Sequence, residues 1–452
     1  MMIVLKHRRT VLLLLIVIVI VVCCCLLQLV LATCNTTRTL QSLSVGPKKM
    51  KIISSSVTHT REWYKQNCLH FKLDEVLSIE YLHVMMKRWQ LSTNKDCIYV
   101  YNKFVDIYNI TWSSGKVVIS NTFKPKVLKW LNNNRSLYAE VLDQHIISIF
   151  NKYTHENTIF NPVRAKRPGV SGDKDVKRYV DDLINSSKQD CDFCAYKTKT
   201  AEDSMGRIES KHSVTAANTF KFDAHHELIL IKQHNCITFT EEQFLDAMNT
   251  AKKWFNKVYE KDKSCKYPQV SWDNLPKASA SQIHPHAQAT LRPARYHGLM
   301  EHLKLSAMAY REHTGSNFFT DLIQIHTVLG LTTTYGNATA LAYLTPKKDH
   351  EIFIISQHAD EAFFRLLYYT IKAFMDDLQL YAWSFFMILP EMGSFGTKQL
   401  MPAIVRIISR GPANVARNDI SSLELFGASN VNIDPFSIIA HIEESVTKRG
   451  WR

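Results

Sequence analysis

The sequence lacks any Arg/Gly-rich or Ser/Arg-rich tract, so nothing in it indicates a nucleic-acid-binding tail. Only 21% of its 452 residues are charged and 46% are hydrophobic, which argues against extended disorder and collagen-like repeats. The ten cysteines do not form one framework, because three of them lie together in an apolar run. A small disulfide-stabilised scaffold is therefore not expected, and the length allows two or three globular domains.

The chain carries an excess of positive charge. Lysine and arginine number 55 and aspartate and glutamate number 41, so the formal net charge is 55 − 41 = +14. This balance favours anionic partners such as phosphates, nucleotides or acidic surfaces, without choosing among them.

The N-terminus has the pattern of a membrane anchor. A basic cluster, Lys6–Arg9, precedes an almost unbroken apolar run from Val11 to Ala32. A membrane-spanning helix needs about 20 apolar residues, whereas the apolar part of a signal peptide needs only about 7–15. The positive-inside rule then predicts a cytosolic tail at 1–10, a type II signal anchor at 11–33 and a lumenal remainder. A cleaved signal peptide is the alternative.

Asn-x-Ser/Thr sequences recur after the anchor. They begin at Asn35, Asn109, Asn134, Asn185 and Asn337. Together with the anchor they predict a glycosylated, single-pass protein of the Golgi or endoplasmic reticulum, with its main part in the lumen.

The region before residue 156 is expected to be separate from the rest of the chain. Residues 34–60 are polar and predict a stem, and 61–155 form an additional lumenal region without a recognisable motif. β-Branched and aromatic runs at 97–101 and 116–119 favour strands, and the spacing over 136–151 favours a helix. Cys68 and Cys97 can pair in an oxidising lumen, although the sequence alone does not establish that bond.

Beyond residue 156 the pattern predicts an α+β protein. We expect a strand within 220–231, a helix over 241–258 and a strand over 268–272. The segment His226–His234 also echoes His350–His358, since both contain His-Glu, four apolar residues and a final Gln-His. Duplication of a strand-helix unit would produce two related lobes, and chance similarity is the alternative.

The most informative motif is His284-Pro285-His286, followed by Gln288 and preceded by Ser281. Side chains alternate along an extended strand, so both imidazoles and the Gln288 amide should share one face, and Pro285 stiffens the segment. A neutral imidazole is a competent nucleophile toward phosphorus near neutral pH. The motif therefore predicts one attacking histidine and one histidine held by a partner.

These residues resemble the galactose-1-phosphate uridylyltransferase branch of the histidine-triad superfamily. The further motifs that match, in the family's order, are Asn161–Pro168, Cys191–Cys194, Asn218–Phe220, His234-Asn235 and Trp272–Asn274. The resemblance implies two histidine-triad-like lobes, each an antiparallel sheet with packed helices. The first, at 156–310, would be catalytic, and the second, at 311–452, is degenerate and matches only loosely.

A metal site follows from both the residue spacing and the resemblance. Cys191 and Cys194 have the spacing that lets two thiolates share one tetrahedral zinc ion. The resemblance adds His234 and His284, which would complete a structural site. A disulfide or redox-active Cys-x-x-Cys is the competing interpretation. Cys236 and Cys265 are candidates for a structural disulfide, or are simply buried thiols.

The resemblance implies a nucleotidyltransferase with a nucleotide sugar and a sugar phosphate as partners. His286 would attack the α-phosphorus, and Gln288 and Ser281 would stabilise charge on its oxygens. The substrate-binding candidates are Arg164, Arg167, Asn218 and Asn274. A nucleotide-sugar or dinucleotide phosphorylase, a non-catalytic lumenal binding protein and a bifunctional glycan-modifying enzyme are the alternatives, and a homodimer is expected from the family.

Four other histidines could be taken for functional residues but are expected to be structural: His225, His226, His350 and His358. No His-x-His occurs after residue 290, so we predict no second metal site in the C-terminal lobe.

Overall fold

A computed structural model describes residues 59–452 except for 72–74, 167–174, 395–399, 417–418 and 451–452. The predicted cytosolic tail, the membrane anchor and almost all of the stem lie outside the described residues. Within the part that is described, no helix is both long and apolar enough to span a bilayer.

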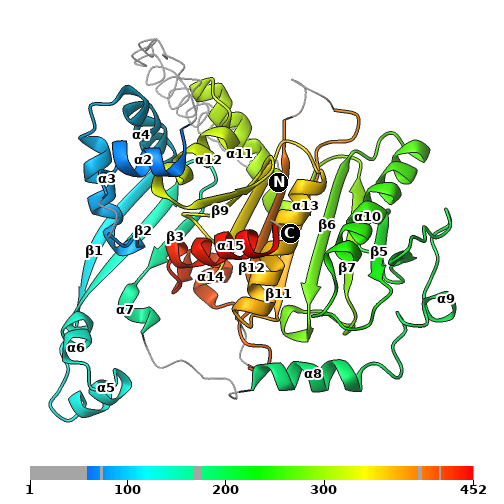
Figure 1. The fold of residues 1–452 in the computed structure, drawn as a ribbon, viewed down its shortest axis with the longest axis horizontal. Helices are drawn as coiled ribbons and strands as arrows, with labels where there is room; N and C mark the ends of the chain where they lie inside the picture. Colours follow the sequence, from blue (N-terminus) through cyan, green and yellow to red (C-terminus); the bar gives the residue numbers. More distant parts are fainter. Residues whose placement is uncertain (1–58, 72–74, 167–174, 395–399, 417–418, 451–452) are drawn as a thin grey trace, which may run out of the picture. The chain divides into compact units, whose positions relative to one another are not determined.

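The core of the molecule is a nine-stranded sheet, antiparallel throughout (Figure 1). Its order is β4-β5-β7-β6-β11-β12-β10-β9-β8. The strands are β4 Ser213–Ala217, β5 His226–Ile231, β6 Tyr267–Asn274, β7 His286–Arg292, β8 Thr332–Tyr335, β9 Ala338–Ala342, β10 Ile352–Ser356, β11 Trp383–Ile388 and β12 Ala403–Ser409. The α+β prediction is thus confirmed, and both halves of the repeat contribute to one continuous sheet.

The sheet contains a topological repeat. In the first half the chain runs β4, β5, α10, β6, β7, and in the second it runs β9, β10, α13, β11, β12. Read inward from β4 and from β9, the two halves have the same strand order and meet at the β6–β11 pair. Their helices α10 (Glu241–Lys261) and α13 (Glu361–Lys372) cover the same face, because Phe244 stacks on Trp272 and Tyr368 contacts Phe244.

The repeated sequence letters do not occupy equivalent places in this topology. Directly paired residues of antiparallel strands share a face. The pairs that connect the halves run Leu228–Gln288, Gln288–Ser271, Ser271–Phe386, Phe386–Arg406 and Arg406–Phe353. Leu228 therefore shares a face with Phe353, whereas its partner in the sequence echo, Ile352, points to the other face. The topology supports a duplication, and the letter match is out of register by one residue.

The additional region forms a second sheet together with β3, which follows it directly, and the C-terminal strand β13. It has the order β1-β2-β3-β13, and β13 runs parallel to β3. These strands are β1 Tyr108–Lys116, β2 Asp143–Asn151, β3 Asn157–Phe160 and β13 Ser429–Val431. Asn151 donates to the Tyr343 hydroxyl at 3.0 Å, and Glu156 pairs with the buried Arg406 at 2.6 Å. Since Arg406 lies on the same sheet face as Gln288, this second sheet covers the second half on the side where the first half carries its histidines.

Three local predictions in the additional region are wrong. Residues 97–101 belong to helix α4 (Lys95–Ile107), which Asn94 caps by accepting hydrogen bonds from two backbone N–H groups, and whose buried Val100 and Phe104 are spaced four residues apart. Residues 136–151 divide between α6 (Arg135–Leu142) and β2, because pairing with β1 draws the second part into the sheet. β1 itself ends at Lys116, so the predicted strand at 116–119 is not formed.

The remaining helices support these sheets. They are α2 Arg61–Asn67, α3 Leu82–Gln90, α5 Lys124–Trp130, α7 Pro162–Ala165, α8 Val176–Ser186, α9 Tyr196–Lys199, α11 Gly298–Thr314, α12 Phe318–Leu329, α14 Ser422–Phe426 and α15 Pro435–Gly450, with short turns of other helix types at Ile79–Tyr81, Pro276–Ala278 and Ala373–Asp377. A disulfide joins Cys68 to Cys97, as the sequence allowed. Cys236 and Cys265 are free and buried, so they are thiols.

Candidate active site

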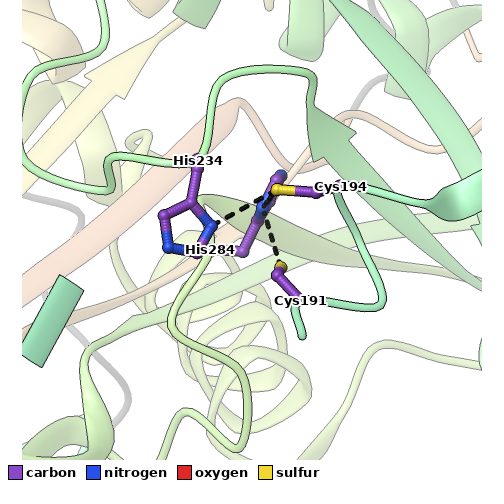
Figure 2. Close-up of side chains that lie close together, drawn as sticks. All are labelled: Cys191, Cys194, His234 and His284. Carbon is purple, nitrogen blue, oxygen red and sulfur yellow. Dashed lines mark hydrogen bonds between the residues drawn. The ribbon is translucent and has the colours of Figure 1, made fainter. Parts of the chain in front are cut away.

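Four predicted metal ligands converge at the edge of the first half of the sheet (Figure 2). Cys191 and Cys194 lie in the turn between α8 and α9, His234 follows β5, and His284 precedes β7. Their donor atoms all lie within 4.8 Å of one another. Cys191 Sγ is 3.4 Å from His284 Nδ1, and Cys194 Sγ is 3.4 Å from His234 Nδ1. Both thiols are free, so the competing disulfide is not formed here.

Backbone carbonyls fix the tautomers of both histidines. His284 Nε2 lies 2.7 Å from the Ile231 carbonyl oxygen, and His234 Nε2 lies 3.0 Å from the Ile184 carbonyl oxygen. A carbonyl only accepts, so each Nε2 carries the proton and each Nδ1 turns a lone pair toward the thiols. This arrangement is typical of histidines that bind a metal through one nitrogen and are oriented through the other.

The thiols also suit a cation. Burial, with the neighbouring Cys191 as a further cause, raises the pKa of Cys194 to about 11. A thiolate pair is therefore unfavourable at this place unless a positive ion compensates it. Two thiolates and two imidazole nitrogens are a donor set for a tetrahedral ion, so the residues present fit a metal site.

His286 opens β7 and has a different hydrogen-bond pattern from its neighbour. Its Nδ1 donates to the His284 carbonyl oxygen at 2.7 Å, which leaves the lone pair on Nε2. That Nε2 makes no hydrogen bond to the described part of the chain. The ring is 8% exposed, and the Phe193 ring packs edge-on against it with centroids 5.1 Å apart. Burial lowers the pKa of His286, which favours the neutral imidazole.

Gln288 and Ser281 lie on either side of this histidine in sequence. Gln288 is on the same strand face as His286, and its Oε1 lies 3.0 Å from Nε2 of the fully buried His226. Ser281 is exposed in the loop that leads into β7. The contacts of Ser281 and Gln288 with a phosphoryl group stay predictions.

The predicted substrate-binding residues have different surroundings. Arg164 is exposed in α7, and Arg167 lies outside the described residues. Asn218 is partly buried, with its amide nitrogen 3.4 Å from His226 Nε2. Asn274 is 1% exposed and donates to the Tyr381 carbonyl oxygen at 2.8 Å, so its amide is engaged inside the fold. Asn218 and Gln288 thus both face Nε2 of His226, and the role of each of these residues in binding stays a prediction.

Polar residues from the second half also reach this face. Asp273 accepts a hydrogen bond from Ser384 at 2.6 Å, and Ser384 in turn accepts from Arg410 at 3.1 Å. The negative charge of Asp273 partly counteracts the effect of burial on the pKa of His286. Arg410 lines a cavity of about 610 Å³ with Lys277 and others. Sequence reasoning missed Ser384 and Arg410, since only the β6–β11 pairing brings them near the first half.

Phe193 is a further residue that was missed. It is the residue before Cys194, and its ring contacts the edges of both His284 and His286. Its place inside the Cys-x-x-Cys motif was a usable signal, because a residue held between two ligands has a fixed position.

A larger cavity of about 750 Å³ lies at α2 and α15, and no predicted site residue lines it.

No known family profile matches the sequence, and no curated protein matches it either. Among solved structures, the chain is similar to an ADP-glucose phosphorylase from Arabidopsis thaliana, with a TM-score of 0.52 and 15% identity over 66% of this chain and 99% of that one. A galactose-1-phosphate uridylyltransferase-like protein from Arabidopsis thaliana gives 0.47 and 15% over 57% and 92%. A uridylyltransferase gives 0.47 and 12% over 66% and 98%. The predicted resemblance is thereby confirmed at the level of the fold.

Proposed function

We propose that this chain is a nucleotidyltransferase that takes a nucleotide sugar as donor and a sugar phosphate as acceptor, through a covalent nucleotidyl-His286 intermediate. The observation that carries the proposal is the bond from His286 Nδ1 to the His284 carbonyl oxygen. It fixes the tautomer in which Nε2 holds a free electron pair, and it holds the ring in one orientation.

The reaction divides into two displacements at the α-phosphorus. In the first, the His286 Nε2 electron pair forms an N–P bond, the P–O bond to the sugar phosphate breaks, and the departing oxygen keeps the bonding pair. The ring becomes a cation that keeps its proton on Nδ1, and this N–H still donates to the His284 carbonyl oxygen. In the second, a phosphate oxygen of the acceptor forms a P–O bond and the N–P pair returns to Nε2. No proton is exchanged with the ring, and a sugar phosphate leaves without a strong acid.

Charge stabilisation falls to groups around the α-phosphate. Gln288 and Ser281 would donate hydrogen bonds to its non-bridging oxygens, and Arg164 and Arg167 would bind the remaining phosphate charge. Gln288 is a neutral amide that cannot protonate a leaving group, which disfavours a hydrolase. Asn218 and Asn274 complete the proposed binding set.

We assign the metal site to structural zinc held by Cys191, Cys194, His234 and His284. All four coordination positions would be filled by protein ligands, so zinc would have no open position for substrate. Its role would be to stabilise the local structure. The support is the 4.8 Å grouping of donors with both Nδ1 lone pairs directed inward. Zinc would fix His284, and through its carbonyl oxygen the His286 ring.

A phosphorylase is the second candidate. The ADP-glucose phosphorylase has the same fold, and such an enzyme uses inorganic phosphate where the transferase uses a sugar phosphate. Both activities share the nucleotidyl-His286 half-reaction and differ only in the acceptor. The two are separated by supplying the labelled enzyme with glucose 1-phosphate, galactose 1-phosphate or inorganic phosphate.

The lumenal location is also proposed. The Cys68–Cys97 disulfide supports an oxidising compartment. The sequon asparagines within the described residues are all exposed: Asn109, Asn134, Asn185 and Asn337. We expect the full chain, expressed in a eukaryotic cell, to lose apparent mass on treatment with a glycosidase that removes N-linked glycans, and to resist protease in sealed vesicles. Protease sensitivity with no mass change would contradict the proposal.

The experiment that tests the reaction uses the full chain in detergent. UDP-glucose, ADP-glucose and a diadenosine polyphosphate, each labelled in the α-phosphate, are added in turn. We expect an acid-labile, base-stable label on the wild type with at least one donor, and none on His286→Ala. Binding of nucleotide without any label would instead identify a non-catalytic binding protein.

A further inference from the structure

A histidine outside the three-residue motif holds the Gln288 amide. We infer that His226 is a positioning residue for the proposed transfer, because it orients Gln288 so that the amide N–H₂ group faces the α-phosphate oxygens. The inference rests on the proposed function and goes beyond it, since the sequence indicated only a structural role for this histidine.

The two side chains lie on one face of the sheet. Leu228 pairs directly with Gln288, and His226 is two residues before Leu228 on the same strand, so His226 and Gln288 are diagonal neighbours. Their atoms Nε2 and Oε1 are 3.0 Å apart. His226 is fully buried, whereas Gln288 is partly exposed, so the contact lies at the boundary between the interior and the open face of the sheet.

A backbone donor settles the tautomer of His226. The Phe222 N–H donates to Nδ1 at 3.4 Å, and a backbone N–H can only donate, so Nδ1 carries the lone pair and Nε2 carries the proton. Nε2 then donates to Gln288, which identifies the facing amide atom as oxygen. The Phe220 N–H donates to the Asn218 side-chain oxygen and so turns the Asn218 amide nitrogen toward Nε2, at 3.4 Å. With the proton on Nε2 this nitrogen is a second donor, so the contact is not a hydrogen bond.

This orientation matters for the chemistry. With its oxygen held by His226, Gln288 must turn its N–H₂ group away from His226, and no described residue accepts a hydrogen bond from that group. Both N–H bonds therefore remain for a ligand on the face that carries His286. If the amide rotated by half a turn, its oxygen would face the phosphate oxygens and repel them.

The surroundings hold His226 in place. The Phe222 ring lies against it with centroids 4.0 Å apart. Burial also lowers the pKa of His226, so the ring keeps a free Nδ1 for the Phe222 N–H near neutral pH. Residues that orient the ligands of a metal site typically change affinity or activity by about 10–100-fold when removed, and we expect a similar range for a residue that orients a catalytic amide.

The test measures how fast the α-³²P label is transferred from the donor to His286 in a single turnover. His226→Leu should slow this step by about 10–100-fold. His226→Gln keeps a donor at the place of Nε2 and should recover most of the rate, whereas His226→Asn places its donor nearer Nδ1 and should not. His225→Ala, next in sequence and outside this contact, is the matched control and should react like the wild type.

A double-mutant cycle distinguishes positioning from a merely structural role. If His226 acts through Gln288, then His226→Gln and His226→Asn should react equally slowly once Gln288→Ala is present. A difference between them that persists in the Gln288→Ala background would overturn the inference, as would folded His226→Asn protein reacting at the wild-type rate. Failure of the wild type to take up label from every donor would instead refute the proposed function, and the positioning role with it.

Discussion

The buried carboxyl of Glu227 gives a stability prediction that does not depend on the enzymatic activity. Glu227 is the second residue of β5 and is fully buried. Burial, with the negative charge of Asp203 as a smaller cause, raises its pKa from the usual 4.5 to about 7, because the charged form loses its hydration. The nearby Thr215, Lys221 and Arg207 offset only part of this rise. The perturbation we propose is Glu227→Gln, which keeps the shape and removes the titration.

The sign follows from the order of the two pKa values. The unfolded chain loses this proton near pH 4.5 and the folded chain near pH 7, so the unfolded state binds fewer protons between them and stability falls as the pH rises through that window. Below pH 4.5 the carboxyl is protonated in both the folded and the unfolded state, so the free energy of unfolding is not reduced. Above pH 7 it is ionised in both states, and the reduction is complete. At ~1.36 kcal/mol per pH unit, the folded state loses about 3 kcal/mol.

The assay is thermal unfolding of wild type and Glu227→Gln from pH 5 to pH 9. For a chain of this size, about 3 kcal/mol corresponds to a midpoint difference of about 4 °C. We expect the unfolding midpoint of Glu227→Gln, measured relative to that of the wild type, to rise by about 4 °C between pH 5 and pH 8. The exposed Glu312→Gln is the matched control and should show no such gain. A constant difference between Glu227→Gln and wild type at every pH would refute the reasoning.

Three further changes have expected outcomes. Cys191→Ser should lower the zinc content, measured by plasma mass spectrometry, from one ion per chain to none; unchanged zinc would contradict the assigned ligands. Glu156→Ala leaves Arg406 buried beside one remaining partner and should cost about 3–5 kcal/mol in denaturant unfolding, and a cost below 1 kcal/mol would show that the ion pair is dispensable. Cys97→Ser opens the loop of 29 residues closed by the disulfide and should cost about 3–4 kcal/mol, seen as a midpoint shift that reductant reproduces in the wild type.

The site depends on both halves of the chain. His284 and His286 come from the first half, while Ser384 of the second half donates to Asp273 across the central strand pair and accepts from Arg410. The corresponding face of the second half is instead covered by the second sheet, to which the additional region contributes β1 and β2, and from which Asn151 donates to the Tyr343 hydroxyl. This arrangement gives residues 61–155 a structural role that no motif indicated.

Several elements were predictable because their signals are local. Helix α10 and strand β6 matched the expected segments, since helical spacing and a short apolar run are properties of neighbouring residues. The region around α4 was not, because its β-branched and aromatic residues suit a strand as well as a buried helix. There the Asn94 cap and the packing of Val100 and Phe104 favoured the helix.

From the sequence, the Cys-x-x-Cys spacing indicated that Cys191 and Cys194 can share one ion, because that spacing depends only on neighbouring positions. The further ligands His234 and His284, and the separate role of His286, came from the family resemblance. Only the tertiary structure decided which nitrogen of each ring carries the proton, since the Ile231, Ile184 and His284 carbonyl oxygens that fix it are placed by folding. It also decided that His226 faces Gln288 and that the repeated letters are out of register, because strand pairing assigns each side chain to a face of the sheet.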